Sequence, residues 1–248
     1  MNRHIIDRSC SPEPDVKSPS MSDKTTRAGT TGQQKQKARR VSGRPMADEA
    51  VGRQIIIDTT IQLLKTRSPE QLSILEIANS AGVTRTLVRY YFTDLKGLLA
   101  EVTEHLMSQL QERMAVVMRL QGTIYERVHQ RLLLRLEFMK EHPHFERLAL
   151  SEIYYYMPSG DAPPSETPLE RITRRAMDLT GMLLDDIPNS TIDSRFLHLV
   201  ILSVSAFIPT ARPLIDNLFG KGPDADRLMD EYLQFISRLL ADRIEQDR

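Results

Sequence analysis

One stretch of the sequence, residues 73–92, concentrates side chains that suit contact with a polyanion. Ser73 and Thr84 stand where two helices would begin, so their hydroxyls and the free amides beside them would face phosphates if the helices met DNA end on. The second helix would expose donors and aromatic rings that fit a major groove. These are Arg85, Thr86, Arg89 and Tyr90, with Tyr91 as a further candidate.

A tight turn between two short helices would present these side chains. Ala78 allows a second helix to approach closely, and Gly82, four residues later, supplies the positive φ that such a turn requires. Four apolar residues would hold the helices together: Ile74, Ile77, Val83 and Val88. The pattern predicts a helix-turn-helix, although an Ala-x-x-x-Gly spacing also occurs in ordinary helical bundles.

The stretch closely resembles the DNA-binding domain of the TetR family of bacterial transcriptional regulators, over about residues 50–100. The run that carries the resemblance comprises Ile77-Ala78, Ala81-Gly82-Val83-Thr84, Tyr91-Phe92 and Lys96-Gly97-Leu98-Leu99. Two positions depart from the commoner pattern of the family. Val88 replaces a Leu and Arg89 replaces a Tyr, which leaves the base preference open.

The resemblance implies a role for each matching position. Ser73 and Thr84 would contact phosphate, Tyr91 would lie against the DNA backbone, and Lys96 would bind phosphate at the start of the next helix. Phe92 would belong to the core. Bases or flanking phosphates would be reached by Arg85, Thr86, Arg89 and Tyr90. The resemblance also implies an all-α C-terminal domain that dimerises through its last two helices and often encloses a ligand.

Charge is unevenly distributed along the chain, although the 248 residues have a formal net charge of zero. Residues 1–98 contain 16 Lys and Arg against 10 Asp and Glu, a balance of +6, whereas residues 99–248 contain 17 against 23, a balance of −6. The basic half suggests a polyanionic partner, double-stranded DNA.

Residues 1–46 lack apolar periodicity, which predicts a disordered basic tail. Its last stretch, residues 35–45, is either a solubilising segment or an arm that touches DNA, with Arg44 as the candidate contact.

Helical periodicity begins at Asp48, and no alternating strand pattern follows. The fold class is therefore predicted to be all-α, with a helix-turn-helix domain at 47–98 and a helical ligand-binding and dimerisation domain at 99–248. Helices are expected at about 48–66, 74–80, 84–90, 95–119, 122–141, 143–157, 165–185, 194–218 and 225–246. Since the helix at 194–218 is apolar on most sides, we expect it to pair with its copy, together with 225–246, in a homodimer.

The C-terminal helices carry most of the 11 methionines on apolar faces, either as core or as the lining of an adaptable apolar cavity. Consecutive tyrosines at 154–156 point in different directions on a helix, so at most one or two can face inward. An effector would lie between the helices near 122–141, 145–157 and 165–185, and would act through the helix at 95–119. The candidate ligand-binding residues are Tyr125, His129, Met139, Tyr155, Met177 and His198.

Other chemistry finds little support in the sequence. His142 and His144 flank Pro143, which suits a loop or helix start better than a metal site, and we expect no cofactor. The sequence shows neither a nucleophile paired with a general base nor a Gly-rich phosphate loop, so nothing in it indicates an enzyme. We expect a cytoplasmic protein, because there is one cysteine, no signal sequence and no apolar stretch long enough to span a membrane. Two functions remain. The first is a ligand-responsive dimeric DNA-binding regulator, expected to be a repressor. The alternative is a DNA-binding protein of the same fold that senses no small molecule and acts through protein or architectural contacts.

Overall fold

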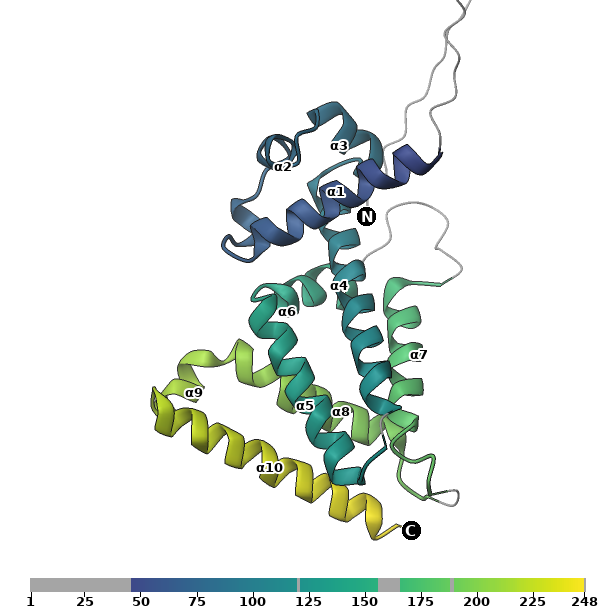
Figure 1. Ribbon diagram of the computed structural model, residues 1–248, viewed down its shortest axis with the longest axis vertical. Helices are drawn as coiled ribbons and strands as arrows, with labels where there is room; N and C mark the ends of the chain where they lie inside the picture. Colours follow the sequence, from purple (N-terminus) through teal and green to yellow (C-terminus); the bar gives the residue numbers. More distant parts are fainter. Residues whose placement is uncertain (1–45, 120, 156–165, 188–189, 248) are drawn as a thin grey trace, which may run out of the picture. The chain divides into compact units, whose positions relative to one another are not determined.

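The computed structural model describes residues 46–119, 121–155, 166–187 and 190–247, with side chains from Gly52 onward (Figure 1). By its contacts the chain separates into residues 1–43 and residues 44–248, and all described elements belong to the second unit. Every element among the described residues is a helix, so the predicted all-α class is confirmed. The predicted tail and Arg44 lie outside the described residues.

Three helices form the head of the molecule, which we define as residues 46–92. They are α1 (Met46–Leu64), α2 (Ile74–Ser80) and α3 (Arg85–Phe92), with a short 3₁₀ turn, η1 (Pro69–Gln71), after α1. Ile56, Ile77 and Val88, one from each helix, are fully buried and belong to the same core cluster. Gly82 has a φ of +66° between α2 and α3, as its place in the turn requires. The helix-turn-helix is therefore formed as expected.

Helix α4 (Leu95–Met118) continues directly from the head into the rest of the chain. A γ-turn centred on Thr93, at φ 63° and ψ −59°, reverses the chain between α3 and α4, and Asp94 caps α4 through the Gly97 amide at 2.7 Å. A Cβ at Gly97 would lie 2.4 Å from the Phe92 carbonyl oxygen. Only glycine therefore fits at position 97, beside the end of α3.

The body, which we define as residues 124–245, surrounds the second half of α4. Figure 1 shows α10 lying along α5, with α7 and α8 on other sides of the body. Fully buried side chains such as Leu132, Leu183 and Ile244 join α5, α10 and the segment after α7 in one core cluster. Its elements are α5 (Ile124–Glu141), α6 (Phe145–Leu148), the π-helix η2 (Ala149–Tyr154), α7 (Pro168–Gly181), α8 (Ser194–Thr210), α9 (Arg212–Phe219) and α10 (Pro223–Glu245).

Two expected helices differ from the structure. The segment predicted as one helix at 143–157 is a short α-helix that widens into η2, where the Tyr155 amide donates to the Leu150 carbonyl five residues earlier. The helix predicted at 194–218 is two helices, α8 and α9, bent by 86°. Pro209 and Pro213 explain the break, because neither can donate a backbone hydrogen bond and each restricts the chain before it. Within the described residues, no single helix has the length and hydropathy of a membrane span, and only the bent α8–α9 pair meets that test.

Candidate nucleic-acid interface and effector cavity

The N-termini of α2 and α3 are capped by the two hydroxyl residues singled out in the sequence. Ser73 Oγ accepts from the Glu76 amide at 3.3 Å, and Thr84 Oγ1 accepts from the Leu87 amide at 3.2 Å. Both residues are exposed. Since each hydroxyl acts as an acceptor in its cap, its proton is free to donate to a phosphate oxygen, beside the open first amides of the helix.

Helix α3 turns its polar side chains outward. Arg85, Thr86, Arg89 and Tyr90 are exposed, Tyr90 by 71% of its surface. Lys96, in the first turn of α4, is also exposed. Neither arginine of α3 nor Lys96 forms an ion pair with any carboxylate in the described parts of the chain. Helix α3 and the start of α4 therefore expose three cations and several donors that are available to an external partner.

The opposite side of α3 fixes its position against the rest of the head. Val88 is fully buried and Phe92 is 4% exposed, so Phe92 is a core residue as expected. Tyr91 is half-buried with its hydroxyl beside Gly52 of α1, where an added Cβ would lie 3.3 Å away. The guanidinium of Arg53 lies 5.3 Å from the Phe92 ring centroid and forms an ion pair with Glu101 of α4. These contacts hold α3 in a fixed orientation relative to α1 and α4.

The body encloses an inner cavity of about 260 Å³ among α4, α5, α7 and α8. Its apolar wall includes Met107, Leu110 and Met114 of α4, and Tyr154 and Leu202 close it on another side. The remaining lining residues are Gln111, Arg131, Arg135, Leu169, Ile172, Thr173, Ala176, Leu179 and His198. The cavity therefore combines an apolar wall with a few polar groups.

Buried cations define the polar side of the inner cavity. Arg131 is 4% exposed; it donates to Thr180 Oγ1 at 2.8 Å and more weakly to the Leu179 carbonyl at 3.4 Å. Burial, with a smaller effect from Arg135, lowers the pKa of Arg131 to about 10, so the group remains charged near neutrality. Arg135 is 7% exposed and forms an ion pair with Glu146 at 2.5 Å.

His198 completes this polar side as a neutral group. Its Nδ1 lies 3.2 Å from Thr180 Oγ1. Burial lowers its pKa to about 4, with further lowering by the charges of Arg131 and Arg135. A neutral imidazole leaves the two guanidinium groups as the cations of the cavity, with Glu146 as the carboxylate that pairs one of them.

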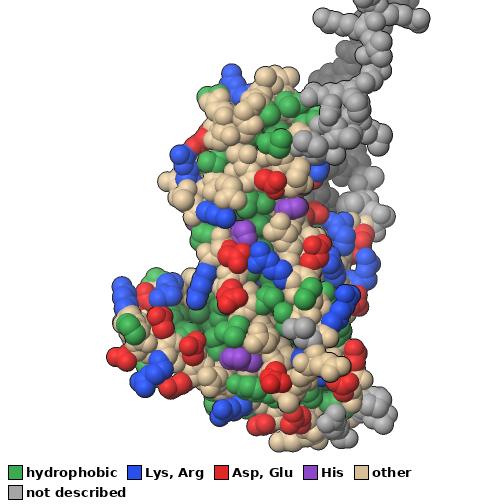
Figure 2. Space-filling model, in the orientation of Figure 1, with side chains coloured by type: hydrophobic (Ala, Val, Ile, Leu, Met, Phe, Trp, Pro, Cys, Tyr) green, Lys and Arg blue, Asp and Glu red, His purple; other side chains and the backbone are tan. Residues whose placement is uncertain are grey.

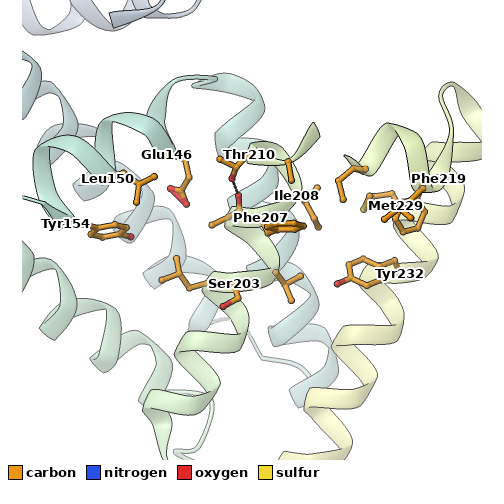
Figure 3. A pocket seen from close by; sticks show the side chains of 16 residues that line it. Glu146, Leu150, Tyr154, Ser203, Phe207, Ile208, Thr210, Phe219, Met229 and Tyr232 are labelled. Carbon is orange, nitrogen blue, oxygen red and sulfur yellow. Dashed lines mark hydrogen bonds between the residues drawn. The ribbon is translucent and has the colours of Figure 1, made fainter. Parts of the chain in front are cut away.

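A larger outer groove of about 950 Å³ lies next to the inner cavity. Figure 3 shows Leu150 and Tyr154 on one side and Met229 and Tyr232 of α10 on the other, with Phe207 of α8 between them. Tyr154 and Leu202 line both spaces and so form the wall that separates them. Because Phe207 is 53% exposed at its rim, the groove is open on the monomer surface, and we regard the smaller, better enclosed cavity as the candidate effector site.

Hydrophobic side chains also gather beside the outer groove. Figure 2 shows them in the hollow between α5 and the α9–α10 arm, with charged side chains at its edge. Leu133, Ile215 and Met229 line a pocket of about 430 Å³ there. The Phe219 and Tyr232 rings, 6.1 Å apart, pack α9 on α10.

Comparisons with known proteins support the reading of the head. Residues 56–102 match the family of bacterial regulatory proteins described as the tetR family. The chain is 36% identical over 74 residues to the HTH-type transcriptional regulator BetI of Serratia proteamaculans (strain 568), a match that covers 30% of this chain and 36% of that protein. Over residues 56–102 the chain is therefore similar to the DNA-binding part of the tetR family of bacterial regulatory proteins. The chain thus spans about a third of the length of the curated relative that it matches.

Similar folds among solved structures extend beyond the TetR-type head. The regulator FadR from Bacillus subtilis, solved with stearoyl-CoA, aligns with a TM-score of 0.54 and 16% identity over 74% of this chain and 96% of its own. A TetR-family regulator from Pectobacterium atrosepticum aligns with a TM-score of 0.55 and 20% identity over 79% and 96% of the two chains. At these identities the likeness establishes the fold: a TetR-type head followed by a helical C-terminal domain.

The structure brings together only part of the predicted ligand set, with His198 in the inner cavity. Tyr125 instead stacks on His129, with 5.6 Å between ring centroids, and His129 Nδ1 lies 3.0 Å from Ser237 Oγ of α10. Met139 is 4% exposed within the core, and Met177 is half-buried but lines neither the inner cavity nor the outer groove. These four side chains are therefore placed outside the cavity, because their faces of α5 and α7 turn to other neighbours.

Tyr155 requires a further correction. Its side chain is 74% exposed, whereas Tyr154 lines the cavity. The π-helical turn of η2 determines which tyrosine faces the cavity. A hydrogen bond to the fifth preceding residue changes the direction of each following side chain relative to an α-helix. Tyr156 lies outside the described residues.

Sequence reasoning did not select Arg135, Gln111 or Tyr154 as cavity residues. A signal for the arginines was present: Arg131 and Arg135 stand four residues apart on α5, next to Leu132 and Leu136 in an otherwise apolar pattern. This spacing is compatible with a buried polar site, but it also occurs on the exposed faces of amphipathic helices, so it does not identify the site by itself. Among the described residues, no group of three or more His, Cys, Asp or Glu side chains is placed to hold a metal ion.

Proposed function

We propose that the protein is a transcriptional regulator that binds a palindromic operator as a homodimer and represses until a small molecule releases it. The observation that carries the proposal is the TetR-type head, whose exposed α3 face bears Arg85 and Arg89 without a carboxylate partner in the described chain. The capped N-termini of α2 and α3 add phosphate-binding amides and hydroxyls. Such a face suits a major groove and its flanking phosphates.

Dimerisation is supported by apolar surface that the monomer leaves uncovered. Phe196 and Leu199 of α8 are 68% and 61% exposed, and Phe235 and Leu239 of α10 are 61% and 56% exposed. Pairing these two helices with their copies across a twofold axis would bury this surface as a four-helix bundle. A twofold dimer would also present two α3 helices to one face of DNA, about one helical turn apart, roughly 34 to 36 Å.

A ligand switch is supported by the course of α4. The same helix carries Lys96 in its first turn and Met107, Leu110, Gln111 and Met114 in the wall of the inner cavity. A ligand in the cavity would therefore touch the element that positions the head. A shift of α4 would change the separation of the two α3 helices and so lower operator affinity; a coupling of about 3 kcal/mol corresponds to roughly a hundredfold change.

The test starts from an operator selected from a random DNA library with the full-length protein. Binding to that operator should be dimeric and salt-dependent, and Arg89→Ala should weaken it while Arg174→Ala, at an exposed arginine of α7, leaves it unchanged. A wild-type protein that selects no sequence would contradict the proposal. The alternative function without an effector would gain if ligands that stabilise the body never alter operator affinity.

A further inference from the structure

We propose that the effector is an amphiphilic monocarboxylate whose carboxylate pairs with Arg131 in the inner cavity while its apolar part lies against the α4 methionines. The inference rests on the proposed ligand switch and names its ligand class. It follows from an uncompensated positive charge inside the body, which is carried by the Arg131 guanidinium group.

Arg131 is buried with no counter-ion among the described residues. No carboxylate in the described chain forms an ion pair with it, and its Nε has no hydrogen-bond partner there. Its two bonds reach a threonine hydroxyl and a carbonyl near the end of α7, whose helix dipole supplies only a partial negative charge. A full cation removed from water normally requires an opposite charge, so the site as it stands is incomplete.

The neighbouring groups do not supply that charge. Arg135 adds a second cation one helical turn away, and Glu146 is already paired with it. His198 is neutral at physiological pH, since burial and the two arginines lower its pKa to about 4. Arg131, Arg135 and Glu146 together leave one net positive charge facing the cavity.

A carboxylate fits this site better than a larger anion. Its two oxygens match the planar donor fork of a guanidinium group, and Arg135 Nε, also without a partner, is available on the same face of α5. Met107, Leu110 and Met114 form an apolar wall for the remainder of the ligand. The cavity of about 260 Å³ is below the usual range for drug-sized ligands, so a longer chain would pass Tyr154 and Leu202 toward the outer groove.

The experiment measures direct binding to the full-length protein without DNA, by titration calorimetry. Octanoate should bind, whereas octan-1-ol and octylamine should bind at least tenfold more weakly, because only the carboxylate supplies the missing charge. Octyl phosphate, which has a larger and more highly charged head, should also bind more weakly than octanoate. Equal binding of octanoate and octan-1-ol would overturn the proposal, and tighter binding of octyl phosphate would overturn the choice of carboxylate.

Substitution of Arg131 separates ligand binding from a structural role. Arg131→Leu should raise the Tm of the ligand-free protein, since it replaces an unpaired buried cation with an apolar side chain, and should lower octanoate affinity by tenfold or more. Arg131→Lys, which keeps the charge, should retain part of the binding. Arg127→Leu is the matched control, because Arg127 lies on the same helix, is paired with Asp186 at 2.8 Å and does not line the cavity.

Arg127→Leu should lower the Tm and leave octanoate binding unchanged. If Arg131→Leu lowers the Tm and binds octanoate normally, Arg131 is a structural cap of α7 and the inference is wrong. Operator binding is then measured separately. Octanoate that binds through Arg131 without changing operator affinity would refute the proposed switch while leaving this site intact, whereas operator binding with no carboxylate site would refute this site alone.

Discussion

The head and the body of this protein use opposite arrangements of charge. In the head and the first turn of α4, cations lie outside: Arg85, Arg89 and Lys96 are exposed, whereas the residues of the head core are buried. In the body, Arg131 and Arg135 are buried beside an apolar cavity, and α8 and α10 expose large hydrophobic side chains such as Phe196 and Phe235. An exposed cation suits a large polyanion that stays in water, and a buried cation suits a small anion that leaves it.

The largest expected effect concerns the hydrophobic surface of the body. Replacing Phe235 with Asp and Leu239 with Glu should give a monomer, because charges at the centre of the proposed four-helix interface would be desolvated. Since two linked heads bind far more tightly than one, operator affinity should fall by about 10²- to 10⁴-fold. Light scattering measures the mass and fluorescence anisotropy the affinity. Leu75→Glu, at a residue of α2 that is 48% exposed, is the control for mass and should stay dimeric.

Specific recognition in the head gives the next largest effect. Arg85→Ala should weaken operator binding by about 1–3 kcal/mol, roughly 5- to 150-fold, and should relax the preference at the base pair that it contacts. Arg174→Ala removes an exposed arginine from α7 and should change neither quantity. Competition titrations against operators with single base changes measure both. A uniform loss across all these operators would place Arg85 on phosphate instead of on a base.

Lys96 should produce a smaller and less selective effect. Lys96→Ala should weaken binding evenly across sequences and reduce the slope of log K against log salt by about one, since one phosphate contact is lost. Lys140→Ala, at an exposed lysine of α5, serves as the control. Anisotropy titrations at several salt concentrations give the slope. An unchanged slope for Lys96→Ala would remove Lys96 from the interface.

The same contrast explains how much could be predicted from the sequence. DNA has a fixed shape and charge, so a protein that reads it needs particular residues at fixed spacing, and Ser73, Gly82 and Thr84 stand where the pattern placed them. A ligand cavity depends on which faces of several helices meet. Periodicity predicted the helices of the body. It did not predict the π-turn that places Tyr154 and not Tyr155 in the cavity wall, nor the contact of His129 with Ser237 of α10. The break at Ala211 was open to prediction from Pro209 and Pro213.

The smallest expected effect tests whether the polar side of the cavity is buried. The folded-state pKa of His198 is about 4, below its ordinary value of 6.5, and burial also lowers the pKa of His142. The unfolded chain therefore binds more protons than the folded one between about pH 6.5 and 4, so the free energy of unfolding should be highest above pH 6.5 and should fall as the pH drops toward 4.

His198→Asn keeps a hydrogen-bonding group near Thr180 Oγ1 but does not titrate, so it should flatten this pH dependence by up to one proton. His142→Asn should flatten it independently, because the two residues lie in different parts of the body and their effects should add. Carboxyl groups with lowered pKa, namely Asp193, Asp247, Glu70, Glu126 and Glu170, add a further loss of stability below about pH 5, so the histidine contribution is read between pH 7 and 5. Urea unfolding at pH 7, 6 and 5 measures the slope. A wild-type slope in His198→Asn would mean that water reaches the imidazole, and a cavity open to water would not need an anion to balance Arg131.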